Sequence, residues 1–310
     1  MNGNLVYKQS TGKNRLQRLF NNDTFLGNLF LFPALLFLGL LIAYPVLSAI
    51  RQSFFNTNFI TGSDKFIGFD NFISIFKDKT FWKALKVDII WTFGSVGFQM
   101  LLGLLAALMI TKESGLNKIV RSILLTPYVI PIISLTLIFR WMLNDTYGII
   151  TSFLVKMNLM EQGSSLLANP ELALPTVIAI NVLRSFPFCM VNYLGTIQSI
   201  PQDQYEAAMI DGTSGFQQFI YITLPSLKGI TLSILVLRTI FEFNSFDMIY
   251  LLTEGGPAQA TQHLPILIYT ESIGMFNFGR ASAISVVMGI ILGIMIVVFT
   301  RLFSRKGRVF

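Results

Sequence analysis

The sequence is poor in the residues that most catalytic and metal sites require. It has one cysteine, Cys189, and one histidine, His263. One cysteine excludes an intrachain disulfide and any cysteine metal cluster, and we expect Cys189 to be a small buried apolar residue inside a helix. One histidine leaves almost nothing for a histidine metal site or a Ser-His-Asp triad, and we expect His263 to lie exposed in a loop. The sequence therefore predicts no catalytic residues, no metal site and no cofactor.

Two binding motifs are also missing. No G-x-x-x-x-G-K-[ST] stretch occurs, since Gly115, Lys118 and the Gly255-Gly256 pair do not have its spacing. No basic cluster with interleaved aromatic residues lies in a polar segment, so the net charge of +7 indicates membrane topology and contact with anionic lipid, not nucleic acid. If nucleotide drives this protein, another chain must bind it.

Charged residues are scarce, and long apolar runs take their place. The chain of 310 residues is 13% charged and 53% hydrophobic, whereas a soluble domain is about 25% charged. A helix needs about 20 mostly apolar residues to cross the hydrocarbon core of a membrane. We predict an all-α integral membrane protein with six transmembrane helices: Asn28–Ile50, Asp88–Ile110, Val120–Leu143, Leu174–Ile197, Gly229–Leu252 and Ala281–Phe303.

The basic residues of the short loops predict the orientation of the chain. With both termini inside the cell, the cytoplasmic side receives Lys8, Lys13, Arg15, Arg18, Lys112, Lys118, Arg121, Lys228, Arg301, Arg305, Lys306 and Arg308. The predicted parts are a cytoplasmic N-terminal segment (1–27), a transmembrane domain (28–303) with a cytoplasmic loop (199–228), and a basic cytoplasmic tail (304–310). The N-terminal segment lacks a small-residue cleavage site, so we expect the first helix to remain as an anchor.

The outer loops are unequal in length. In the stretch from Arg51 to Val87, Phe69, Phe72, Ile73 and Phe76 recur at helical spacing and predict an amphipathic helix along the membrane surface. The stretch from 145 to 173 is predicted to be another outer loop with some helix of its own.

A polar segment, Glu206 to Pro225, interrupts two apolar runs of membrane length. Ser199 with Gln202 and Ser214 with Gln217 have the form of capping boxes, which predicts two short helices. Gly212 is placed to close the first helix in the left-handed conformation. Such a pair of helices on the cytoplasmic face suits either docking into a groove of a partner or lying in the membrane interface.

The same segment resembles a family signature. Glu206-Ala207-Ala208, three residues, Gly212, nine residues and Ile222-x-Leu224-Pro225 match every fixed position of the EAA loop of ATP-binding-cassette importer permeases. The resemblance implies the type I importer permease (MetI-like) fold and a loop that seats in a cleft of an ATPase subunit. It implies that coupling role for Glu206, Ala207, Ala208, Asp211, Gly212, Ile222, Leu224 and Pro225.

A second resemblance narrows the family. The stretch FEFNSFDMIYLLTEGGPAQATQHLPILIY (241–269), followed by FNFGRASAISVVM, is similar to the last two helices of carbohydrate-uptake permeases of the maltose-transporter type. This implies a heterodimer with a second permease subunit, two ATPase subunits, an extracellular sugar-binding protein and a bacterial or archaeal cytoplasmic membrane. ATP hydrolysis then belongs to the separate ATPase subunits, and this chain is not an enzyme.

Polar residues inside the predicted membrane helices are candidates for a substrate path, because they are costly unless they face a cavity or a partner. The candidates are Asn181, Arg184, Glu242, Asn244 and Asp247. Planar polar groups bind sugar hydroxyls, and the nearby Phe186, Phe243 and Phe246 are candidates to cover sugar rings or to serve helix packing. Arg238 and Glu242, four residues apart, also fit an internal ion pair.

Several readings stay open at this level. Pro127, Pro131 and Pro187 lie in apolar runs and predict either bends that let the helices rock or fixed kinks. A sugar importer permease working by alternating access agrees best with both resemblances. A secondary transporter or channel would have no need of the polar segment, and a membrane enzyme would need a catalytic group that the sequence lacks.

Overall fold

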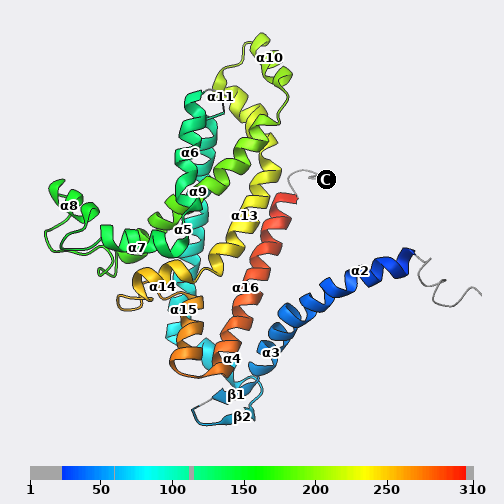
Figure 1. The fold of residues 1–310 in the computed structure, drawn as a ribbon, viewed down its shortest axis with the longest axis vertical. Helices are drawn as coiled ribbons and strands as arrows, with labels where there is room; N and C mark the ends of the chain where they lie inside the picture. The colour runs from blue at the N-terminus through cyan, green and yellow to red at the C-terminus, as the bar shows by residue number, and fades with distance from the viewer. Residues whose placement is uncertain (1–22, 59, 112–114, 305–310) are drawn as a thin grey trace, which may run out of the picture.

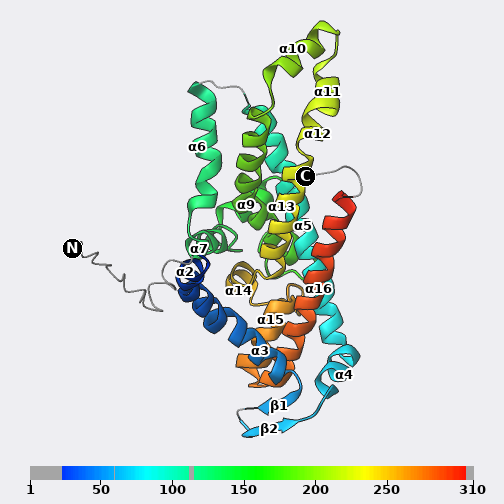
Figure 2. The ribbon, with the colours of Figure 1, turned by 90° about the vertical axis from the view of Figure 1, so that its right-hand side faces the viewer.

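The computed structural model describes residues 23–58, 60–111 and 115–304, with side chains described from residue 30 to residue 302 of those ranges. It is an elongated bundle of long helices (Figure 1). A loop that contains α10 lies at one end, and the β1–β2 hairpin lies at the other; we call these the loop end and the hairpin end (Figures 1 and 2). Most of the predicted N-terminal segment and tail fall outside the described residues.

Within the described ranges, four helices are long and apolar enough to cross a membrane unbroken, and the total is six if each of two bent helix pairs is one span. The unbroken spans are Phe30–Gln52, α5 (Lys79–Met109), α9 (Ala173–Gln198) and α16 (Phe278–Ser304). The first of these consists of α2 (Asp23–Leu38), a π-helical turn η1 (Gly39–Ala43) and α3 (Tyr44–Gln52). The predicted number of helices is therefore compatible with the structure, but two of the predicted spans are not continuous.

The third predicted span, Val120–Leu143, breaks in its middle. Helix α6 (Gly115–Val129) and helix α7 (Ile132–Met142) meet at an angle of 95°. Pro131 caps α7 in an extended conformation, with φ −54° and ψ 137°, and its ring leaves no backbone N–H to continue the helix. The prediction of one continuous helix was wrong, whereas the break at Pro131 agrees with both readings of that residue, a bend that lets the helices rock and a fixed kink.

The fifth predicted span, Gly229–Leu252, is also interrupted. Helix α13 (Lys228–Phe243) ends at Asn244, and a separate helix α14 (Asp247–Thr253) begins after three residues. The segment that follows contains α15 (Leu264–Tyr269) and a π-helical turn η3 (Thr270–Gly274). Irregular backbone inside a membrane protein is stable only where protein or a cavity surrounds it, so this break marks a place to look for a site.

The hairpin end contains the elements of the stretch from Arg51 to Val87 that was predicted to be an outer loop. The predicted helix of this stretch is present as α4 (Asp70–Lys77). The antiparallel strands β1 (Phe55–Asn58) and β2 (Ser63–Phe66) were not predicted. The strand β1 packs so closely on α16 that a Cβ at Gly279 would lie 2.1 Å from the Phe55 carbonyl oxygen. The stretch from 145 to 173 contains a helix as predicted, α8 (Ile149–Lys156).

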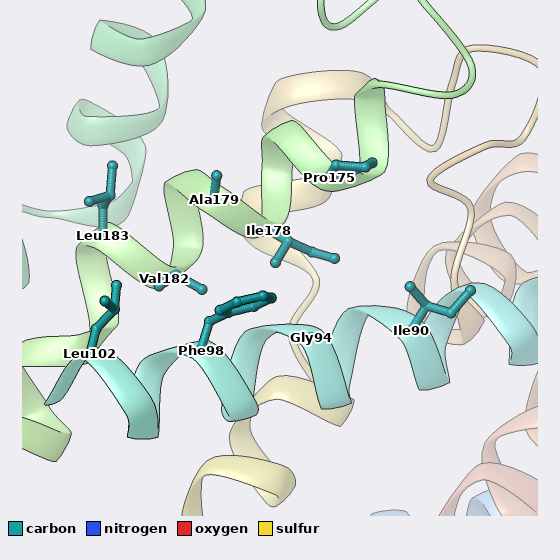
Figure 3. Close-up of a pocket in the computed structure, with 9 residues that line it drawn as sticks. All are labelled: Ile90, Gly94, Phe98, Leu102, Pro175, Ile178, Ala179, Val182 and Leu183. Carbon is teal, nitrogen blue, oxygen red and sulfur yellow. The ribbon is translucent and has the colours of Figure 1, made fainter. Parts of the chain in front are cut away.

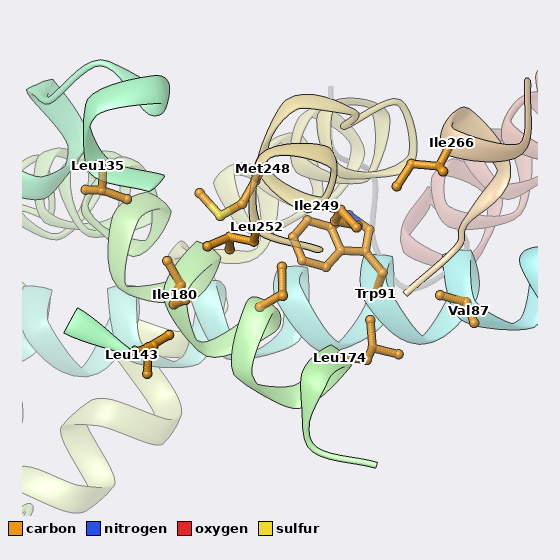
Figure 4. Close-up of a cluster of buried hydrophobic side chains, with 11 residues drawn as sticks. Val87, Trp91, Leu135, Leu143, Leu174, Ile180, Met248, Ile249, Leu252 and Ile266 are labelled. Carbon is orange, nitrogen blue, oxygen red and sulfur yellow. The ribbon is translucent and has the colours of Figure 1, made fainter. Parts of the chain in front are cut away.

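The centre of the bundle is the contact between α5 and α9. A Cβ at Gly103 would lie 2.5 Å from the Cβ of Cys189, so the two helices touch through a glycine. Cys189 is fully buried, as predicted. Nearer the hairpin end, Trp91 of α5 lies among apolar side chains of α9 and α14, including Leu174 and Ile249 (Figure 4).

His263 corrects one of the sequence predictions. It lies in the connection between α14 and α15, as expected, but its side chain is fully buried and not exposed. Its ring lies 6.4 Å from the ring of Trp91, centroid to centroid, and its Nε2–H donates a hydrogen bond to the carbonyl oxygen of Ser245. The loop folds back onto α5, and only this long-range contact buries the residue.

The first span differs from the others because it has little contact with the bundle. Its α2 part projects away from the other helices, as Figure 1 shows, while α3 contacts α16. None of the side chains in the window from Phe30 to Gln52 that meets the hydropathy test is buried within the chain. Large apolar residues such as Phe30, Leu41 and Tyr44 are about 70–80% exposed. This helix is therefore an arm whose apolar surface the chain itself does not cover.

Candidate functional site

A polar cavity of about 670 Å³ lies where the two interrupted spans break. Helix α9 supplies one wall, the α6–α7 bend supplies a second, and the break between α13 and α14 supplies a third. The residues that line it are Tyr128, Ile132, Asn181, Arg184, Phe188, Arg238, Phe241, Glu242, Asn244, Ser245, Phe246 and Asp247. All five residues predicted for a substrate path, Asn181, Arg184, Glu242, Asn244 and Asp247, are among them.

The helix breaks explain why polar groups gather at this place. A helix that ends leaves backbone N–H or C=O groups without partners, and these groups favour a hydrated surrounding. Helix α13 ends at the cavity and α14 begins there, so Asn244, Ser245 and Asp247 face it from irregular backbone or from a first turn. Discontinuous helices with free ends are a recurring way to build binding sites inside membrane proteins.

Glu242 is the centre of a buried hydrogen-bond network behind this wall. Its Oε1 accepts a hydrogen bond from Gln99 Nε2 at 3.0 Å and forms an ion pair with Arg238, and its Oε2 accepts one from Asn181 Nδ2 at 2.6 Å. Arg238 Nε donates to Gln99 Oε1 at 2.9 Å. The network joins α5, α9 and α13 and confirms the predicted ion pair between Arg238 and Glu242.

Arg184 differs from this network. It lines the cavity and is only half-buried, and its Nε has no hydrogen-bond partner among the described residues. Asn244 and Asp247 are exposed at the same cavity, although the Asn244 side chain donates to the carbonyl oxygen of Ile240. The groups with free bonding capacity are therefore Arg184 and Asp247, whereas Asn181 and Glu242 are occupied by each other.

The aromatic lining differs in part from the expected one. Phe246 lines the cavity, but Phe186 and Phe243 are buried in apolar clusters between helices. Phe188 and Phe241 take their places. Phe186 and Phe243 therefore serve helix packing, which was one of their two predicted roles, because residues two apart on a helix point in nearly opposite directions. Phe188 lies four residues after Arg184 and hence on the same face of α9, and this spacing could have predicted its place in the cavity.

A second cavity, of about 570 Å³, lies between α5 and α9 and contains no such chemistry (Figure 3). It is lined by Ile90, Gly94, Phe98, Leu102, Pro175, Ile178, Ala179, Val182 and Leu183. None of these residues has a polar side chain, so this groove suits an apolar neighbour and not a polar ligand.

The second candidate region is the loop from 199 to 228, which forms the far tip of the loop end (Figure 2). It contains α10 (Gln202–Ile210), α11 (Gly215–Gln218), a π-helical turn η2 (Phe219–Thr223) and α12 (Leu224–Ser226). The last three elements form one apolar helical segment that meets α13 at an angle of 60°. Two short helices were predicted here, and the structure contains both.

The turn between the two helices is closed by a glycine. Gly212 has φ +78°, its N–H donates to the Met209 carbonyl oxygen at 3.1 Å, and the Thr213 N–H donates to the Ala208 carbonyl oxygen at 3.0 Å. This pair of bonds is a Schellman motif, which requires a residue in the left-handed conformation. The predicted helix stop at Gly212 is confirmed.

One of the two predicted capping boxes is present. The Ser214 hydroxyl accepts from the Gln217 N–H, and the Gln217 side chain accepts from the Ser214 N–H. The other was wrong: the Ser199 hydroxyl donates to the Thr196 carbonyl oxygen at the end of α9. Pro201 begins α10 without a side-chain cap.

The tip of the loop presents apolar side chains to the outside. Ile210 is 88% exposed and Phe216 is 74% exposed, and Met209 also lies on the surface. The predicted residues Glu206, Ala207, Asp211 and Gly212 are exposed beside them, while Ala208 and Ile222 are half-buried. Leu224 and Pro225 are exposed on α12. A contiguous apolar tip with small residues is typical of a surface that another protein covers.

A bundle of apolar helices with a polar cavity at two helix breaks and an exposed apolar loop tip is typical of a membrane transport subunit. The chain belongs to the family of the binding-protein-dependent transport system inner membrane component, whose model matches residues 99–308. Members of this family are ABC transporter permeases, so the chain is a transport subunit embedded in a membrane and not an enzyme.

Relatives support the same assignment over nearly the whole chain. The inner membrane ABC transporter permease protein YcjO of Escherichia coli is 33% identical over 89% of this chain and 94% of its own length. The trehalose/maltose transport system permease protein MalF of Thermococcus litoralis is 31% identical over 95% and 98%. A solved bacterial alginate ABC transporter, in complex with a pentasaccharide-bound periplasmic protein, contains a chain that is 25% identical, with a TM-score of 0.77 over 94% of this chain and 98% of that one.

Proposed function

We propose that this permease carries a sugar or oligosaccharide through the cavity at the helix breaks. The observation that carries the proposal is the lining, where planar polar groups of Arg184, Asn244 and Asp247 lie beside the rings of Phe188, Phe241 and Phe246. Sugars offer hydroxyl groups to such polar side chains and apolar ring faces to aromatic ones. The named substrates of the similar proteins, trehalose, maltose and alginate, are carbohydrates.

We propose further that the loop from 199 to 228 couples this chain to an ATPase. Its exposed apolar tip, with Ile210 and Phe216, offers a surface for docking, and the Schellman motif at Gly212 fixes the shape of that surface. In the described residues the chain has no phosphate-binding loop, and its sequence has no such motif. The energy for transport therefore enters through contact with two separate ATPase subunits.

The exposed arm supports a heterodimer with a second permease subunit. The apolar residues of α2, η1 and α3 have no cover within the chain, and lipid or another helix must provide it. An arm that leaves its own bundle reaches a neighbouring subunit, whereas a helix that served only as a lipid anchor would be expected to pack on its own bundle. An extracellular sugar-binding protein would then deliver substrate at the hairpin end.

This assembly defines an orientation. The loop end, with Lys228 and Arg301, faces the cytoplasm of a bacterial or archaeal cell, and both termini lie on that side, following the bias of basic residues. Transport proceeds by alternating access, in which the ATPases and the binding protein each prefer one of two conformations. A sodium- or proton-driven carrier would not require the docking tip.

Ala207→Asp tests the coupling. The side chain is exposed, so the substitution leaves the fold of the chain intact, but it places a charge at the tip where a partner would have to desolvate it. We expect the variant to insert into the membrane normally and to lose uptake and co-purification of the ATPase. Ala207→Ser, which stays small and neutral, is the control and should keep both.

Uptake is measured with labelled maltose and trehalose in cells that contain the intact transport system. Normal uptake and normal ATPase co-purification of the Ala207→Asp variant would refute the coupling role. A transporter that accumulates a non-carbohydrate solute but neither these nor other sugars would refute the substrate class while leaving the coupling role in place.

A further inference from the structure

Helix α5 carries a stripe of buried polar residues that the cavity does not explain. Asp88, Thr92, Ser95 and Gln99 follow one another at intervals of four, three and four residues, which places them on one face of the helix. Each of them is fully buried. Gln99 is bonded to Arg238 and Glu242, but the side-chain oxygens of Asp88, Thr92 and Ser95 have no hydrogen-bond partner within the part of the chain that the structure describes.

The two hydroxyl groups behave differently from others in this protein. A serine or threonine inside a helix commonly donates to the carbonyl oxygen four residues earlier. Thr136 on α7, Thr176 on α9 and Ser285 on α16 all do so, at 2.6, 2.7 and 3.0 Å. The hydroxyl groups of Thr92 and Ser95 make no such bond, so the usual local partner does not satisfy them.

His263 adds a fourth unsatisfied group beside the same helix. Because its Nε2–H donates to the Ser245 carbonyl oxygen, its Nδ1 is the acceptor nitrogen, and this atom is buried without a partner. Burial lowers the pKa of His263 to about 4, since a charged ring would lose its hydration, so the ring is neutral at physiological pH. The ring contacts Trp91, which lies between Asp88 and Ser95 along the chain.

Among the described residues, Asp88 forms no ion pair that would balance an ionised carboxylate. Its side chain is fully buried in α5, against which α15 packs, and its carboxyl oxygens receive no hydrogen bond there. Lys83 is exposed and bonds the Ala258 carbonyl oxygen, Lys86 is exposed, and Arg238 is held by Glu242 and Gln99. An isolated carboxylate in such surroundings costs several kcal/mol, which favours the neutral form.

We propose that Asp88, Thr92, Ser95 and His263 form a buried site that binds water molecules, with the Asp88 carboxyl group protonated. The unsatisfied atoms consist of two acceptors, namely the His263 Nδ1 and the carbonyl oxygen of the Asp88 carboxyl group, of one donor, the O–H of that carboxyl group, and of two hydroxyl groups that both donate and accept. Water supplies the missing donors and acceptors, and buried water in proteins occupies places of this kind.

The site stabilises one wall of the cavity. His263 holds the carbonyl of Ser245, a cavity residue at the break between α13 and α14, and Trp91 Nε1 donates to the Glu242 carbonyl oxygen at 3.0 Å. Through Trp91 and His263 the proposed site therefore adjoins the backbone at the end of α13 and within the break itself. This inference concerns the fold and stands whether or not the substrate is a sugar.

Infrared spectroscopy of the purified chain tests the protonation. At pH 7.5, where exposed carboxyl groups with pKa values of about 4 are ionised, we expect the intact protein to keep a protonated-carboxyl C=O band that shifts in D₂O. The band should disappear in Asp88→Asn, whose melting temperature should stay within about 2 °C of the wild type because one neutral polar group replaces another. Asp88→Leu, which removes the water partners, should melt at a lower temperature.

Matched threonine variants test the water. Thr92→Val should shift the Asp88 band, because it removes a group that binds the same water, while Thr136→Val, which removes a buried hydroxyl bonded to its own helix, should leave the band unchanged. A wild-type spectrum without the protonated band would overturn the proposal. So would a melting temperature that rises with added Na⁺ or K⁺ in the wild type but not in Asp88→Asn, since the site would then hold a metal cation.

Discussion

At the scale of single residues, two arginines line the same cavity but have different roles. Arg238 is buried and bonded to Glu242 and Gln99, so it belongs to the structure of the wall. Arg184 is half-buried with a free Nε, so its bonding capacity remains available to a ligand. The sequence predicts that both arginines lie within membrane helices, and only their hydrogen-bond partners in the structure distinguish them.

This difference predicts that replacing each arginine by glutamine affects different properties, stability at position 238 and uptake at position 184. Arg238→Gln leaves Glu242 buried without its charge partner and should lower the free energy of unfolding by about 3–5 kcal/mol. Arg184→Gln should change it by less than about 1 kcal/mol but should reduce uptake. Thermal unfolding of the purified chain and uptake in cells measure the two effects. A strongly destabilised Arg184→Gln variant with normal uptake would assign that residue to the structure instead.

At the scale of elements, the contact between α5 and α9 depends on Gly103. An added Cβ would lie 2.5 Å from the Cβ of Cys189 and 2.9 Å from the backbone nitrogen of Met190, and neither atom can move without moving α9. Gly103→Ala should therefore destabilise the chain by about 1–3 kcal/mol through overpacking.

Gly97 on the same helix is the matched control, because a Cβ there meets no atom within 4 Å. Gly97→Ala should be neutral or slightly stabilising, since alanine favours a helix. Equal melting temperatures of the two variants would mean that the helices separate easily at Gly103. The clash involves the Cβ and backbone atoms of residue 189, which alanine also has, so Cys189→Ala should not restore the stability that Gly103→Ala loses.

The elements also show how far the sequence could predict the structure. Hydropathy found every long apolar helix, because the membrane imposes that length. It missed the break after Val129, where Ile130 and Pro131 are as apolar as their neighbours, and the break after Phe243, where Asn244, Ser245 and Asp247 were interpreted as polar residues of a continuous helix. The local structure at Pro131 and Gly212 could be predicted because proline restricts the backbone and glycine permits the left-handed conformation.

Other features could not be predicted from the sequence because they depend on contacts between residues that are far apart in the chain. His263 looks like a loop residue until α15 brings it against Trp91. The four-residue strands β1 and β2 are too short to give a periodic pattern. The five residues predicted for a substrate path line one cavity, because polar groups inside membrane helices are costly unless they face a cavity or a partner.

At the scale of the whole molecule, the exposed arm predicts where a second permease subunit binds. A benzophenone attached to Leu40→Cys, in a Cys189→Ala background, should form a photochemical cross-link to that subunit, because Leu40 is 58% exposed on the arm. Mass spectrometry of the cross-linked product identifies the partner.

The control position is Phe153→Cys on α8, which is equally exposed but lies on the opposite side of the bundle from α2 (Figure 1). It should give no protein cross-link. If Leu40→Cys labelled only lipid in the assembled transporter, the arm would be a membrane anchor and the subunit contact would have to lie elsewhere.

The hydroxyl groups of Tyr205 and Thr223 are 2.9 Å apart and join α10 to the helical segment that follows it. In the proposed coupling to an ATPase, a displacement of α10 would be passed through this hydrogen bond to the segment that runs into α13, and α13 would turn with it. Helix α13 has 16 residues and is about 24 Å long, so a turn of about 10° at its loop end would move its other end by about 4 Å. That other end is the cavity wall, where a displacement of this size is close to the width of a sugar ring.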